Sequence, residues 1–148
     1  MTLPRAMPVV APTWHELARS KHWTLAREPV RRIVRVQRTD VPFGDLTEWD
    51  TEFGVIQQAL GIYDRGTHAM LLDMRAAPMR TDDAFNARVR NAQQTALNGF
   101  ARTAILVRTA VGMLQLTRTR RENGREGVGV FHDEADAIAF LGMPRDRR

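Results

Sequence analysis

The sequence predicts a single α/β domain: a mixed, mainly parallel sheet with an N-terminal hairpin and helices on its faces. The first observation is an apolar run at residues 69–74, which is typical of a central strand buried on both faces. The second is a similar run at residues 103–107. The third is helical periodicity before, between and after these runs. Strands that alternate with helices imply right-handed crossovers and parallel pairing.

The chain length indicates one domain. A chain of 148 residues is long enough to bury about 68–70% of its unfolded surface in one core. Residues 1–12 contain three prolines and no periodicity, and we expect them to form a mobile tail. We expect the domain to cover residues 13–142 and a basic tail to cover residues 143–148.

Composition narrows the class of protein. The chain has no cysteine, which excludes thiol chemistry, disulfides and cysteine-ligated zinc. No run approaches the roughly 18 apolar residues of a membrane span. The first residues also lack the charged-then-apolar plan of a signal peptide. We therefore expect a cytoplasmic protein without a membrane span.

The net charge of +5 invites comparison with nucleic-acid-binding proteins. Lys21 is the only lysine among the 22 basic residues, and so lopsided a ratio indicates a GC-rich coding bias more than phosphate recognition. The charge is also uneven, since residues 39–64 contain acids and no base. We do not expect nucleic acid to be a partner.

The segment before the first predicted strand has a helix signal. Thr13 and Glu16 have the spacing of a capping box. This spacing predicts a short leading helix that ends near Ser20.

Residues 23–26 and 33–38 alternate between apolar and polar side chains, with a break between them. This pattern predicts a β-hairpin. Arg31 and Arg35 fall on one face of its second strand, together with Gln37. These arginines either discourage edge-to-edge pairing or form a docking face, and we favour the first interpretation.

From residue 45 the apolar period becomes helical, with acids near the start and Gly61 at the end, which predicts an amphipathic helix over residues 45–61. We expect further helices after Thr81 or Asp82, from residue 109 to about residues 123–124, and after Asp133, with a last strand over residues 128–131. The predicted core comprises Trp49, Phe53, Leu71, Leu72, Phe85, Ile105, Val107 and Leu141.

No motif in the sequence dictates a reaction. A glycine-rich phosphate loop is absent, and Ser20, the only serine, lies outside any nucleophile-elbow pattern. The histidines are scattered singly, so a metal site is not expected. We therefore expect no catalytic residue, no metal and no cofactor, and a protein that is not an enzyme.

Several polar side chains nevertheless share one kind of position in the predicted fold. They fall at the predicted carboxyl ends of strands or at the starts of the following helices, where free backbone N–H groups suit an anion or a phosphorylated side chain. We expect a partner or ligand to bind at this edge of the sheet. An alternative interpretation is that Asp73 simply pairs with Arg75. The candidate residues are Asp73, Arg75, Arg80, Thr81, Thr109 and Gly112.

Several of these patterns together resemble the STAS superfamily, and within it the SpoIIAA-like sulfate-transporter and anti-sigma-factor-antagonist domains. The resemblance covers residues 22–142. The stretches that carry it are LLDMR at 71–75, FARTAILV at 100–107, TAVG at 109–112 and VFHDEADA at 130–137, which closes on Phe140 and Leu141.

The resemblance implies a SpoIIAA/STAS-like fold and a non-enzymatic regulatory module, in bacterial signalling or scaffolding. Such domains bind a kinase, an anti-sigma factor or another signalling protein, and a homo-oligomer is an alternative assembly. Antagonist members are phosphorylated on a Ser or Thr soon after an Asp that follows the central strand. Asp73 matches that Asp, whereas Met74 and Arg75 follow it, and Thr81 is the nearest hydroxyl.

A second interpretation is a small anionic or lipid-like ligand-binding protein that uses the carboxyl edge of the sheet. An enclosed cavity of several hundred Å³ beside Asp73 and Thr109 would favour a ligand. A flat exposed face there would favour a protein partner.

Overall fold

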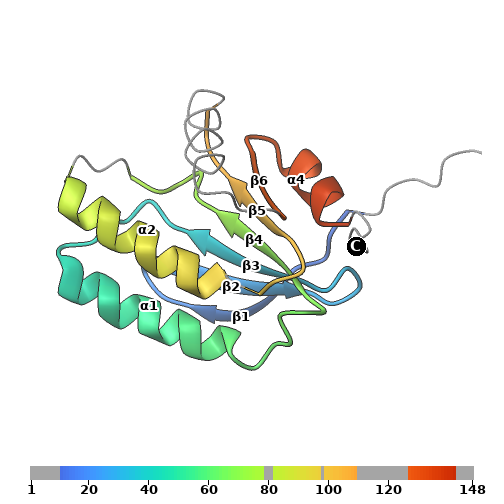
Figure 1. The fold of residues 1–148 in the computed structure, drawn as a ribbon, viewed down its shortest axis with the longest axis horizontal. Helices are drawn as coiled ribbons and strands as arrows, with labels where there is room; N and C mark the ends of the chain where they lie inside the picture. The colour runs from blue at the N-terminus through green and yellow to red at the C-terminus, as the bar shows by residue number, and fades with distance from the viewer. Residues whose placement is uncertain (1–10, 79–81, 98, 110–126, 143–148) are drawn as a thin grey trace, which may run out of the picture.

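The computed structural model describes residues 11–78, 82–97, 99–109 and 127–142, and it has the mixed α/β architecture that the sequence predicts. A six-stranded sheet carries helices on its faces (Figure 1). The elements in chain order are β1 (His15–Arg19), β2 (Trp23–Glu28), β3 (Ile33–Arg38), α1 (Leu46–Leu60), β4 (Ala69–Asp73), α2 (Asp83–Leu97), β5 (Thr103–Leu106), β6 (Val128–Phe131) and α4 (Glu134–Leu141).

The strands lie in the sheet in the order in which they occur in the chain. β1 pairs antiparallel with β2, and β2 with β3. β3, β4, β5 and β6 are parallel to their neighbours, with α1 and α2 in the first two connections. Because parallel strands end at the same edge of a sheet, the carboxyl ends of β3 to β6 gather there.

The two faces of the sheet bury different sets of side chains. α1 and α2 lie side by side (Figure 1) and contribute to the larger core cluster, which includes Leu72 and Ile105. α4 packs over β4, β5 and β6, and the smaller core cluster there includes Leu71 and Leu141. β4 is buried along its whole length because both clusters use it. Every residue of the predicted core is buried, which confirms that prediction.

The helix starts follow the local sequence. Asp45, Asp82 and Asp133 precede α1, α2 and α4, and each accepts a hydrogen bond from the backbone N–H three residues further on. Gly61 follows the last residue of α1, as predicted. Among the described residues, no helix is long and apolar enough to cross a membrane.

The predicted leading helix is wrong, because this segment forms β1. Its residues pair with β2, with Ala18 opposite Leu25. A helix of this length makes few internal hydrogen bonds and needs packing to persist, whereas the strand gains a ladder along the edge of β2. All five residues of β1 are exposed, and β1 forms the edge of the sheet.

The proposed role of Arg31 and Arg35 in discouraging edge pairing is also wrong, because β3 lies between β2 and β4 inside the sheet. Arg35 instead lies on the same face as Ile33, which belongs to the cluster beneath α4. The predicted tails and the predicted helix from residue 109 to about residues 123–124 fall outside the described residues, except for residues 11, 12 and 109.

Candidate functional site

The end of β4 carries a buried carboxylate. Asp73 is the last residue of β4, and only 2% of its surface is exposed. It lies on the α4 face of the sheet, because Leu71, two residues earlier, belongs to the cluster beneath α4. A carboxylate in such a place requires hydrogen bonds and an opposite charge.

Arg75 supplies both the hydrogen bonds and the opposite charge that the Asp73 carboxylate requires. Its Nε donates to Asp73 Oδ1 at 3.1 Å and its Nη2 to Asp73 Oδ2 at 2.9 Å, a two-pronged pairing. The backbone N–H of Arg75 donates to Oδ1 at 3.1 Å, and Gln37 Nε2 on β3 donates to Oδ2 at 3.3 Å. The alternative interpretation of an Asp73–Arg75 pair is therefore confirmed. Donors occupy both oxygens, so the carboxylate has a structural role.

Acids at the start of α4 extend this cluster. The pKa of Arg75 is raised, first by its hydrogen bonds to Asp73 and, against the effect of burial, by the charges of Asp73, Glu134 and Asp133. The pKa of Arg35 is lowered by burial, although Glu134 and Asp73 act in the opposite direction. The first turn of α4 therefore lies within electrostatic reach of the end of β4.

The loops that follow β4, β5 and β6 place exposed residues at the same edge of the sheet as the end of β4. Pro78 follows β4, Arg108 and Thr109 follow β5, and His132 follows β6, and all four are exposed. Because the three strands are adjacent and parallel, these residues lie at one edge of the sheet. We call Pro78, Arg108, Thr109 and His132 the carboxyl-edge face.

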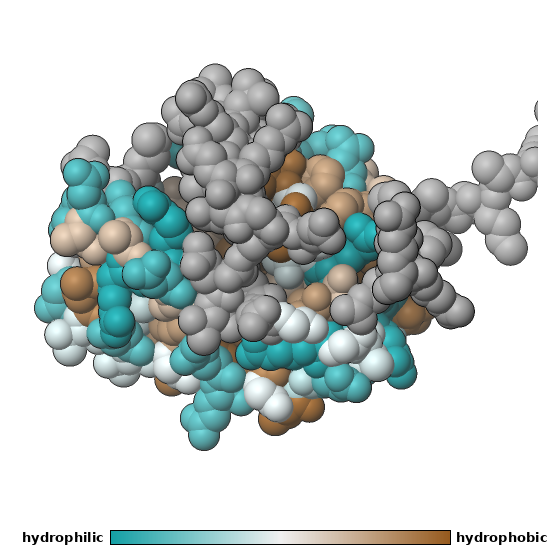
Figure 2. Space-filling model, viewed as in Figure 1, coloured by the Kyte–Doolittle hydropathy of each residue, from teal (hydrophilic) through white to brown (hydrophobic). Residues whose placement is uncertain are grey.

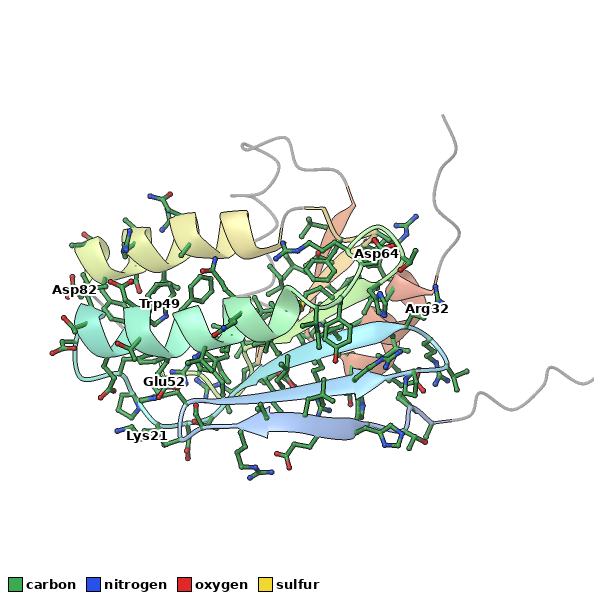
Figure 3. All side chains as sticks on the ribbon, turned by 90° about the horizontal axis from the view of Figure 1, so that it is seen from below. Lys21, Arg32, Trp49, Glu52, Asp64 and Asp82 are labelled. Carbon is green, nitrogen blue, oxygen red and sulfur yellow. The ribbon has the colours of Figure 1, made fainter. Side chains whose placement is uncertain are left out.

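A pocket opens on the α1/α2 face of the sheet at the carboxyl ends of β3 and β4, between the N-terminal halves of α1 and α2 and the loop that follows β4. It has a volume of about 160 Å³. Trp49, which lines the pocket, lies at the same end of the molecule as Asp82, and Arg32 and Asp64 lie at the other end (Figure 3). The outer surfaces of α1 and α2 are mainly hydrophilic (Figure 2). The apolar walls of the pocket include Trp23, Phe43, Trp49, Met74, Phe85 and Val89.

One arginine lines this pocket. Arg38 is the last residue of β3 and is only 6% exposed. Its Nη1 donates to the backbone oxygens of His22 at 2.9 Å, Thr39 at 3.2 Å and Val41 at 3.3 Å. Its Nη2 donates to the same Val41 oxygen at 3.3 Å. Neutral carbonyl groups therefore hold the guanidinium in place.

Aromatic rings flank the same guanidinium. Its central carbon lies 4.6 Å from the ring centre of Phe43 and 5.3 Å from that of Trp23, within the range of cation–π attraction. Burial lowers the pKa of Arg38. In the part of the chain that the structure describes, no carboxylate forms an ion pair with Arg38.

The acids of α1 contact other bases. His22, which is fully buried, places Nε2 3.0 Å from Glu48 Oε1 and Nδ1 3.5 Å from Glu52 Oε1. Lys21 Nζ lies 3.7 Å from Glu48 Oε2. Within the described ranges, no group of three or more histidine or acidic side chains could hold a metal ion.

The structure shows where the predicted site residues lie. Asp73 and Arg75 form one contact pair, and Thr109 follows β5 at the same edge of the sheet. Arg80, Thr81 and Gly112 fall outside the described residues, and so does the phosphorylation considered at Thr81.

The sequence reasoning missed Gln37 and Arg38. Gln37 was missed because it reaches Asp73 through the pairing of β3 with β4, in which the two residues are opposite each other. A pattern within one segment of the sequence does not reveal the register between two strands. A signal for Arg38 was present, because alternation places it on the face that Val34 and Val36 bury.

No known protein family, no curated protein and no solved structure matches this chain.

Proposed function

We propose that the chain is a non-catalytic protein-interaction and regulatory module of the STAS type, SpoIIAA-like, that works in bacterial cytoplasmic signalling or scaffolding. The observation that carries the proposal is the state of Asp73. Its carboxylate is buried and both oxygens accept hydrogen bonds from Arg75 or Gln37. An acid held in this way fixes the loop after β4.

The arrangement of the strands supports the same proposal. β2 and β3 pair antiparallel before the parallel strands begin, and helices follow β3, β4 and β6. This order agrees with the SpoIIAA-like arrangement that the resemblance implies. It also brings three adjacent strand ends to one edge, where a rigid sheet can hold recognition loops in place.

We assign partner binding to the carboxyl-edge face. The face combines a proline, a cationic group, a hydroxyl and an imidazole, a mixture that suits a non-obligate protein contact. Arg108 is exposed there, and the side chain of Arg75, which follows β4 at the same edge of the sheet, is 39% exposed. Because the charge of Arg75 is paired with Asp73, the preference for an acidic group on the partner surface rests on Arg108.

The test is affinity purification with quantitative mass spectrometry from the native organism, with the whole chain as bait. Arg108→Glu reverses a charge on the carboxyl-edge face and touches no core residue. Arg32→Glu is the matched control, because Arg32 is equally an exposed arginine but lies in the turn at the opposite end of the molecule (Figure 3).

We expect one protein to be captured in near-stoichiometric amounts by the wild type and by Arg32→Glu. Its recovery should fall by about tenfold with Arg108→Glu, the effect of about 1.4 kcal/mol of lost binding. Equal losses for both variants would place the working surface elsewhere. A substrate turned over by the purified chain would replace the proposal with an enzymatic function.

A further inference from the structure

The charge of Arg38 has no counter-charge in the described structure. The guanidinium is buried, and its partners there are backbone carbonyls and aromatic rings. The acids on α1, Glu48 and Glu52, contact His22 instead. A buried cation is most favourable when an anion pairs with it, so the site has an unmet preference for negative charge.

The hydrogen bonds of Arg38 leave one edge of the guanidinium available. A guanidinium has five N–H groups in a planar fork. The Val41 oxygen accepts from Nη1 and Nη2, and the His22 oxygen accepts from Nη1. Within the described part of the chain, no acceptor meets Nε. The edge formed by Nε and Nη2 is the one that Arg75 uses to hold the Asp73 carboxylate.

The size and walls of the pocket define the rest of the ligand. Its volume of about 160 Å³ is close to that of an engineered cavity of about 150 Å³ that binds benzene. Trp23, Phe43, Trp49 and Phe85 contribute aromatic surface, which favours a ring through offset-stacked or edge-to-face contacts. A single ring fits this space better than a long acyl chain.

We propose that this pocket binds a small aromatic carboxylate, with its ring between α1, α2 and β3 and its carboxylate on the Nε/Nη2 edge of Arg38. The site is distinct from the Asp73–Arg75 pair, because Arg38 belongs to the α1/α2 face of the sheet, whereas Asp73 and Arg75 lie on the α4 face. It adjoins the carboxyl-edge face, since Pro78 belongs to that face and also lines the pocket. The proposal does not depend on the proposed protein partner.

The first experiment uses the unmodified whole chain. Benzoate and its neutral isostere benzamide are titrated separately by calorimetry, with tryptophan fluorescence as a second readout because Trp23 and Trp49 line the pocket. We expect benzoate to bind at least about tenfold more tightly than benzamide, since only benzoate pairs with the charge. Equal affinities, or no benzoate binding up to about 10 mM, would overturn the proposal.

The second experiment blocks the pocket. Val89→Phe adds a ring from α2 at a half-buried lining position, and Ala87→Phe adds the same ring at an exposed position of the same helix. Benzoate affinity should fall at least about tenfold with Val89→Phe and stay within about twofold with Ala87→Phe. The same affinity for Val89→Phe as for the wild type would show that benzoate binds elsewhere.

The third experiment removes the charge. Arg38→Met, with folding checked by circular dichroism, should reduce benzoate binding to the level of benzamide and leave benzamide binding unchanged. A preference for benzoate that survives in the folded variant would overturn the assignment to Arg38. If Arg38→Met does not fold, two other measurements test the proposal. They are the ratio of benzoate to benzamide affinity in the wild type, and the difference in benzoate affinity between Val89→Phe and Ala87→Phe.

Discussion

Two arginines at the carboxyl ends of neighbouring strands are stabilised in different ways. Arg75, just after β4, pairs with the buried Asp73 carboxylate. Arg38, at the end of β3, is more deeply buried and is held by carbonyl oxygens and aromatic rings. They lie on opposite faces of one sheet, because alternation assigns Asp73 to the side of Leu71 and Arg38 to the side of Val36.

The difference separates a structural ion pair from a site that is ready for a ligand. Arg75 has its anion within the chain, so its remaining exposed part contributes to a surface. Arg38 has a charge, a fixed position and an adjoining pocket, but no anion among the described residues. An ion pair built into the fold indicates stability, whereas an unmatched buried charge beside a cavity indicates binding.

The largest expected effect tests the core that underlies this comparison. Leu72→Ala should lower the free energy of unfolding by about 2–5 kcal/mol, because Leu72 is buried in the cluster beneath α1 and α2. Urea denaturation measures the change. Val55→Ala on the exposed side of α1 is the control, since Val55 is 61% exposed and its truncation should cost about 0.5 kcal/mol or less. Equal midpoints for Leu72→Ala and the wild type would contradict the position of β4.

The second prediction breaks the Asp73–Arg75 pair from each side. Arg75→Met leaves a carboxylate that is 2% exposed with Gln37 and one backbone N–H as its donors, and should cost about 3 kcal/mol of unfolding free energy. Asp73→Asn should cost only about 1 kcal/mol, because the amide oxygen still accepts and Arg75, 39% exposed, reaches water.

Thermal and urea unfolding of both variants give the comparison. The asymmetry is the informative result, because it follows from the unequal burial of the two partners. Equal losses of unfolding free energy for Arg75→Met and Asp73→Asn would contradict the unequal burial of Asp73 and Arg75.

The third prediction concerns Arg38. Arg38→Met should lower the free energy of unfolding by about 1 kcal/mol, less than Arg75→Met, because it leaves no buried carboxylate behind. The His22 oxygen keeps a hydrogen bond from the backbone N–H of Thr39 at 2.9 Å. A loss as large as that of Arg75→Met, measured by urea unfolding, would mean that Arg38 has a structural role comparable to that of Arg75.

The sequence predicted the elements that local patterns determine. The stripe from Trp49 to Leu60 identified α1, and the apolar run that contains Leu72 identified β4, because burial on one or both faces leaves a periodic trace. β1 was mistaken for a helix, because the Thr13 capping box is local and the pairing with β2 is not.

The candidate site was predicted only in part, for the same reason. Asp73 and Arg75 are two residues apart, so their pair was visible as an alternative in the sequence. Gln37 joins them through the register of β3 with β4. The pocket beside Arg38 depends on how α1 and α2 pack across β3, and no pattern within one segment reports that packing.

The smallest expected effect concerns Glu48, whose carboxylate lies on the α1 side of the molecule and is committed to groups other than Arg38. A hydrogen bond from the backbone N–H of Gly44 is the largest cause of the lowered pKa of Glu48. Desolvation opposes it and is the second-largest effect, and the charges of Lys21 and His22 lower the pKa further. A lowered pKa in the folded state means that folding favours the charged form. Its contribution to stability is therefore present above the ordinary value of 4.5 and is lost as the pH falls through the lowered value.

Glu48→Gln removes this dependence and keeps an oxygen for the Gly44 N–H. Between about pH 6 and pH 3, the difference in unfolding midpoint between the wild type and Glu48→Gln should shrink as the pH falls. A difference that stays constant would mean that the charge of Glu48 does not contribute to folding. A difference that shrinks assigns the charge of Glu48 to its contacts with Gly44, Lys21 and His22, and leaves Arg38 without a carboxylate partner among the described residues.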